Sequence, residues 1–121
     1  RGSNKKQLTE NDIVLVTNID WKKRIIYSRS PSGKKASLNA PLAQKIFDKF
    51  PRVRSIVHTH SFKPSSPTTS FPETPGTLEY VLASMPLFKK GSIINLNNHG
   101  LIAIGDNLKE IVQHVIKTSK K

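Results

Sequence analysis

The sequence predicts a single domain of the mixed α/β class, with helices packed on a mixed sheet. Its 121 residues are enough to close one hydrophobic core. Because 36% of them are hydrophobic and 23% are charged, close to globular averages, we expect the chain to fold. Short β-branched runs and segments of helical periodicity follow one another in the order β-β-α-β-α-β-β-α, which combines hairpins with crossovers.

The first part of the chain contains a predicted hairpin and a predicted helix. Residues 12–17 are a short β-branched run bounded by polar residues, and residues 24–28 follow after a turn, so the two are expected to pair as antiparallel strands. Apolar side chains then recur at helical spacing. Asn39 is placed to cap this helix, Pro41 suits its first turn and Pro51 ends it.

The second part begins with a predicted strand over residues 53–60. Residues 61–75 are rich in proline, serine and threonine and form a long loop, which we expect to be either a lid over a site or the replacement of a regular element. Further elements are predicted as follows: a helix over residues 77–87, strands over residues 92–96 and 101–104, and a helix capped by Asn107.

The charge balance favours anionic ligands. Lys and Arg number 20 against 8 Asp and Glu, a formal net charge of +12. The basic pairs are scattered and lack aromatic interleaving, so we do not expect a nucleic-acid partner. No apolar run is long enough to span a bilayer and cysteine is absent, so we expect a cytoplasmic protein with no membrane span.

The start of the chain is polar. Arg1, Gly2 and Ser3 resemble residues added by a cloning vector, and there is no initiator methionine. We therefore expect residues 1–7 to be a tag remnant and polar lead, and residues 8–121 to form the single domain.

Three histidines are candidate metal ligands. His58 and His60 are two residues apart on a predicted strand, so their side chains project to the same side and can chelate one ion such as Zn²⁺. His99 precedes Gly100 in a turn, where glycine permits a positive φ or a close backbone approach that would let His99 reach the pair. The alternative is a pair of surface histidines, because short motifs also match by chance. His114 is expected to be structural or solvated.

Several motifs share their order with a known family. They are residues 8–16 (LTENDIVLV), Ala40-Pro41-Leu42 opening a helix that ends at Phe50-Pro51, residues 57–61 (VHTHS) and residues 98–105 (NHGLIAIG). In this order, over about residues 8–116, the chain resembles the class II aldolase/adducin family.

The resemblance implies a three-layer α/β/α domain with a mixed, largely antiparallel central sheet, often assembled as a homo-oligomer, commonly a tetramer. It also implies one Zn²⁺, or another divalent first-row metal, on His58, His60 and His99. In catalytic members this metal polarises the hydroxyl and carbonyl oxygens of a small phosphorylated sugar and stabilises the enediolate of retro-aldol cleavage. Adducin heads keep the fold without the chemistry.

The chain departs from the enzymes of this family before the first helix. They usually have Ser-Ser-Glu/Asp-Thr where this sequence has Ser37-Leu38-Asn39-Ala40. The resemblance assigns Ser37 to phosphate binding and Asn39 to the acid/base position, where an amide cannot exchange a proton near neutral pH. The family's N-terminal helix and Gly-Asn-Ile-Ser phosphate loop have no counterpart before Leu8, so we expect an N-terminally incomplete or reduced, divergent member.

Two functional hypotheses follow. The first is a zinc-dependent carbon-carbon lyase of the class II aldolase type, acting on a small anionic, phosphorylated substrate. The second is a non-catalytic, adducin-head-like binding or scaffold domain that has lost the acid/base residue at Asn39.

Overall fold

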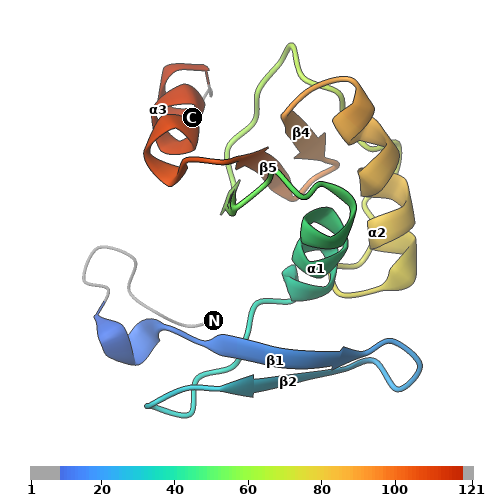
Figure 1. Ribbon diagram of the computed structural model, residues 1–121. Coiled ribbons are helices and arrows are strands. Elements are labelled where there is room, and N and C mark those ends of the chain that lie inside the picture. Colours follow the sequence, from blue (N-terminus) through green and yellow to red (C-terminus); the bar gives the residue numbers. More distant parts are fainter. Residues whose placement is uncertain (1–8, 119–121) are drawn as a thin grey trace.

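The computed structural model describes residues 9–118 of the protein (Figure 1). The expected tag remnant and polar lead, residues 1–7, lies outside the described residues, as does Leu8. In chain order the elements are η1 (Glu10–Asp12), β1 (Leu15–Asp20), β2 (Ile25–Arg29), α1 (Ala40–Lys49), β3 (Ser55–Thr59), α2 (Leu78–Ser84), η2 (Met85–Lys89), β4 (Ile93–Leu96), β5 (Gly100–Gly105) and α3 (Leu108–Thr118), where η denotes a 3-10 helix.

The strands pair antiparallel in two sheets. β1 and β2 form a two-stranded ribbon, and β3, β5 and β4 form a three-stranded sheet in that order. The mixed α/β class is therefore confirmed. Among the described residues the one parallel pairing is an isolated bridge between Thr68 and Asn95, so the strands lie in two antiparallel sheets and not in one mixed sheet.

Side chains, and not a strand ladder, connect the ribbon to the rest of the domain. Trp21 follows β1 and packs against the core cluster that includes Leu42 and Ile46 of α1. The ammonium nitrogen of Lys45 lies 4.9 Å from the centre of the Trp21 ring, a cation–π contact. In Figure 1 the ribbon lies below α1 and apart from the other strands, which accounts for the division into two sheets.

The first strand begins three residues later than the expected start at residue 12. Residues 10–12 instead form η1, because the Asp12 carboxylate accepts a hydrogen bond from the backbone N–H of Thr9 at 2.8 Å and closes a capped turn. Asp12 also pairs with Lys34 at 2.7 Å. The turn and the ion pair thus hold Asp12 outside the strand.

Helices cover both faces of the three-stranded sheet. One core cluster joins Ile94 and Ile102 to side chains of α1 and α2, whereas another joins Leu101 and Ala103 to Ile111 of α3. Alternate residues of β5 therefore enter different clusters, as side chains on a strand must. In the part of the chain that the structure describes, no helix combines the length and apolar character that crossing a bilayer requires.

The start of β5 depends on a glycine. Gly100 has a φ of +137°, and a Cβ placed there would lie 2.0 Å from the Thr59 carbonyl oxygen and 2.8 Å from the Cα of His60. The expected close approach at Gly100 is thus confirmed. It lets the beginning of β5 press against the end of β3.

Gly100→Ala is expected to lower the free energy of unfolding by about 3 kcal/mol, because it adds both a backbone clash and an unfavourable φ. Chemical denaturation followed by circular dichroism measures the change. Gly91→Ala is the matched control, since that position has open space and should change stability by less than about 1 kcal/mol. Equal effects at the two glycines would show that the close approach is not needed.

Candidate metal centre

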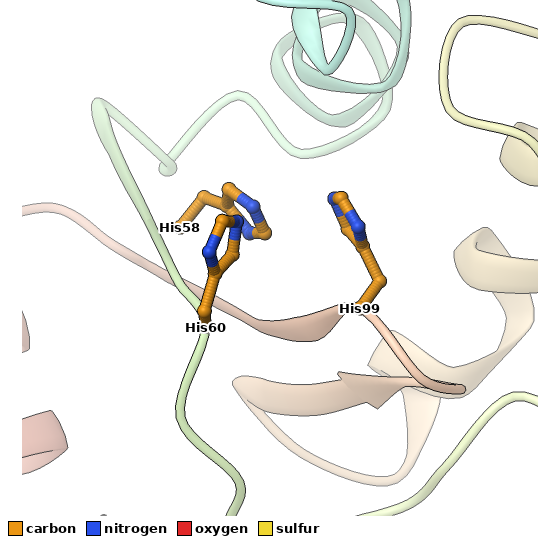
Figure 2. A group of neighbouring side chains, drawn as sticks. All are labelled: His58, His60 and His99. Carbon is orange, nitrogen blue, oxygen red and sulfur yellow. The ribbon is translucent and has the colours of Figure 1, made fainter. Parts of the chain in front are cut away.

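The antiparallel pairing of β3 and β5 brings the three histidines together. His58 pairs with Ile102 and Thr59 with Leu101, so the end of β3 lies beside the start of β5. His99 stands immediately before β5, in a turn where its own N–H donates to the Leu96 carbonyl at 2.9 Å. Figure 2 shows the result, with His58 on β3, His60 on the segment just after β3 and His99 on the segment that enters β5.

The imidazole rings are close enough to share one ion. One nitrogen from each of His58, His60 and His99 lies within 4.8 Å of the others, and the ring centres are 4.9 to 5.5 Å apart. Zinc binds histidine nitrogen at about 2.0–2.1 Å, so small ring rotations would bring the three nitrogens to a single ion. The sequence prediction that these three histidines meet is confirmed.

His58 is held in the orientation and tautomer that metal binding requires. Its Nδ1 lies 2.9 Å from the carbonyl oxygen of Leu101. A carbonyl only accepts, so Nδ1 carries the proton and the ring's lone pair is on Nε2. Metal-binding histidines commonly use one nitrogen for the ion and donate the other N–H to a carbonyl or carboxylate in this way.

His99 presents a polar atom that the protein itself does not satisfy. Its Nε2 is buried and has no hydrogen-bond partner, an arrangement that costs free energy unless another group binds there. Burial, and secondarily the charge of His60, lowers the pKa of His99 and favours the neutral ring. Neutral imidazole is the form that binds a metal, so this donor set fits a divalent first-row ion.

The long loop of residues 61–75 forms a wall of the site. A cavity of about 610 Å³ is lined by His60 and His99, by Phe62 and Thr68 of the loop, and by Asn97 after β4. The Asn97 amide donates to the carbonyls of Thr69 and Ser70, both at 3.2 Å. The loop is therefore fixed to β4 beside the histidines.

Asn95 is the main attachment between this loop and the sheet. Its side chain is fully buried in β4, where its oxygen accepts the N–H of Lys63 at 2.9 Å and its amide donates to the Lys63 carbonyl at 2.7 Å. The same amide lies within hydrogen-bond distance of the Ser66 carbonyl and the Thr68 hydroxyl. One side chain thus satisfies several polar groups of a loop that has no regular structure.

Ser37 and Asn39 lie near His58. Both line a second cavity, of about 400 Å³, that also contains His58. Asn39 stands at the N-cap of α1, but its side chain makes no cap hydrogen bond. Its oxygen instead accepts the hydroxyl of Tyr80, and its backbone N–H donates to the Ser37 hydroxyl at 3.1 Å.

Tyr80 is a site residue that the sequence analysis missed. It is only 3% exposed, and its ring meets His99 edge-on with centres 6.2 Å apart. Burial raises the pKa of its phenol, so Tyr80 remains a neutral donor to Asn39. A tyrosine within an apolar helical pattern was the available signal, because a buried hydroxyl needs a partner.

His114 lies away from the cluster. It is on α3 and lines a different, smaller cavity with Glu110 and Asp106. It is therefore a natural control for experiments on the other three histidines.

No protein-family model and no curated protein matches the sequence. The chemistry assigned to the site consequently rests on its own features: three converging imidazoles, an unsatisfied buried nitrogen and two adjoining cavities.

Asn95→Leu is expected to destabilise the protein by about 3 kcal/mol, because the backbone groups of Lys63 lose their buried partners. It should also loosen the loop, which faster chymotryptic cleavage after Phe62 would reveal. Asn98→Gly, at an exposed position with a φ of +56°, should change stability by less than about 1 kcal/mol. Unchanged stability and unchanged cleavage in Asn95→Leu would contradict the anchoring role.

Proposed function

We propose that this chain is a metal-binding domain of the class II aldolase/adducin type, with Zn²⁺ held by His58, His60 and His99. The convergence of three imidazoles, one of them with a buried and unsatisfied nitrogen, is the observation that carries the proposal. Helices on both faces of the three-stranded sheet support the three-layer α/β/α arrangement that this assignment requires. Three nitrogen ligands leave a position open for substrate, as in catalytic zinc sites.

The proposed activity is retro-aldol cleavage of a small phosphorylated sugar. When bound, the metal would act as a Lewis acid on the hydroxyl and carbonyl oxygens of the substrate. The cavity walls would orient that substrate, and Ser37 with Arg54 offers polar contacts for its phosphate. The Asn39 amide, held by Tyr80, can orient a polar group but cannot take up a proton.

The second candidate is a non-catalytic domain of the same type. Two observations favour it: the acid/base position holds an amide already hydrogen-bonded to Tyr80, and the metal-ligand cluster found among the described residues contains no carboxylate. Such a domain would keep the metal as a structural or ligand-binding element. The two candidates share the metal centre and differ in turnover.

Purified protein supplied with zinc is expected to hold about one Zn²⁺ per chain, as elemental analysis would measure. His58→Ala and His99→Ala should hold much less, because two imidazoles bind a zinc ion less tightly than three. His114→Ala is the matched control and should bind zinc as the wild type does. Failure of the wild type to bind zinc, in protein shown by circular dichroism to be folded, would overturn the metal centre.

Asn39→Asp is expected to raise the rate of ketose phosphate cleavage by about a hundredfold, because a carboxylate at this position can accept a proton. Aspartate also keeps an oxygen to accept the Tyr80 hydroxyl, so the fold should be retained. Asn98→Asp, which adds a carboxylate to the other cavity, is the control and should not accelerate cleavage. The release of aldehyde product by zinc-loaded protein measures the rate.

Absence of cleavage in both the wild type and Asn39→Asp, at full zinc loading, would favour the non-catalytic candidate. If the wild type cleaves the substrate and His99→Ala does not, the activity belongs to the metal centre.

A further inference from the structure

Two cavities of different chemistry adjoin the histidine cluster. His60 and His99 line the larger one, whose other walls include the polar side chains of Ser61, Thr68 and Asn97. His58 lines the smaller one. Because the three histidines lie within a few ångströms of one another, a ligand bound at the metal would adjoin both cavities.

The smaller cavity is predominantly apolar. It lies between α1, β3 and the start of α3, and its walls include the following aliphatic and aromatic side chains: Leu42, Ala43, Ile46, Phe47, Ile56, Ile102 and Leu108. Phe47 and Leu108 remain 42% and 54% exposed, although large apolar side chains gain free energy when they are covered. These walls are therefore suited to an apolar group.

The charged groups of this cavity are few. Arg54 is its one cationic lining residue among those described, and that side chain is 80% exposed and lies 3.4 Å from the Asp106 carboxylate. Deeper in the cavity, Ile46 and Ile102 are almost completely buried. A phosphate placed against them would lose its hydration without compensation.

We propose that the smaller cavity receives an apolar part of the ligand whose oxygen atoms bind the metal. This inference rests on the proposed metal centre. The natural ligand would then be an amphiphilic small molecule, with chelating oxygens at the histidines and an aliphatic substituent between α1 and α3. A phosphate, if the ligand has one, would lie outside these apolar walls, against the exposed side chains of Ser37 and Arg54.

A small molecule suits this cavity because the cavity is continuous with the candidate metal centre. The imidazole of His58 is at once a metal ligand and part of the cavity wall, so one molecule can satisfy both. A second copy of the chain could also cover Phe47 and Leu108, but such an interface would not depend on the metal. The two occupants therefore give different results.

The test measures binding of straight-chain alkyl hydroxamates to zinc-loaded protein by isothermal titration calorimetry. Acetohydroxamate reports chelation at the metal alone, while butano-, hexano- and octanohydroxamate add methylene groups. Affinity is expected to rise roughly threefold to fourfold for each methylene group buried, until the cavity is filled. Ala43→Phe, which fills the cavity, should abolish this rise without weakening acetohydroxamate. Val112→Phe, on the exposed surface of α3, is the matched control and should keep the rise.

The outcomes distinguish this inference from the metal centre itself. If acetohydroxamate fails to bind, the metal centre is wrong. Binding of acetohydroxamate without a gain from longer chains overturns the apolar cavity alone. Competition by inorganic phosphate against octanohydroxamate but not acetohydroxamate would make the cavity a phosphate site. A change of oligomeric state in Ala43→Phe, seen by analytical ultracentrifugation, would make it a subunit interface. Either of these last two results also overturns the inference.

Discussion

The contact between the backbones of Gly100 and Thr59 is the constraint on which the candidate site depends. No Cβ fits between them, and the φ of Gly100 is one that other residues rarely adopt. This contact sets where β5 starts against β3, and so it sets the distance from His99 to His58 and His60. Because β5 is the middle strand, its position also fixes β4 and the loop that Asn95 attaches to it. A single close approach thus supports both the metal ligands and one cavity wall.

Features that depend on neighbouring residues could be predicted from the sequence. The shared face of His58 and His60 follows from the alternation of side chains along a strand. Glycine at position 100 indicated that a close approach or a positive φ was permitted there, although the partner of that approach, Thr59, lies 41 positions away. The cap of α3 is equally local, since Asn107 accepts the N–H of Glu110 at 3.2 Å as expected. The order of helices and strands also agrees with the prediction.

Features that depend on tertiary contacts could not be predicted in this way. The hydrogen bond from Tyr80 to Asn39 joins residues 41 positions apart, and no periodicity shows it. In α2, Leu78 and Leu82 are 52% and 63% exposed, whereas Tyr80 and Val81 face the core and are 3% exposed, a difference that helical spacing alone does not show. The separation of the β1–β2 ribbon from the larger sheet likewise reflects its packing on α1 and not its strand sequence.

The net charge of the protein attracts anions over a long range, whereas the chemistry of the site acts only on a bound molecule. The net charge of +12 creates a field that attracts anions. Among the described residues, however, Arg54 is the one permanently charged cation that lines the two cavities beside the histidines. Three neutral imidazoles would leave the full charge of a divalent ion uncompensated, so that ion would be the strongest local attraction for an anionic oxygen. The surface can therefore increase the local concentration of anionic molecules without selecting among them. Selection would come from the oxygens that the metal accepts and from the apolar group that fits beside His58.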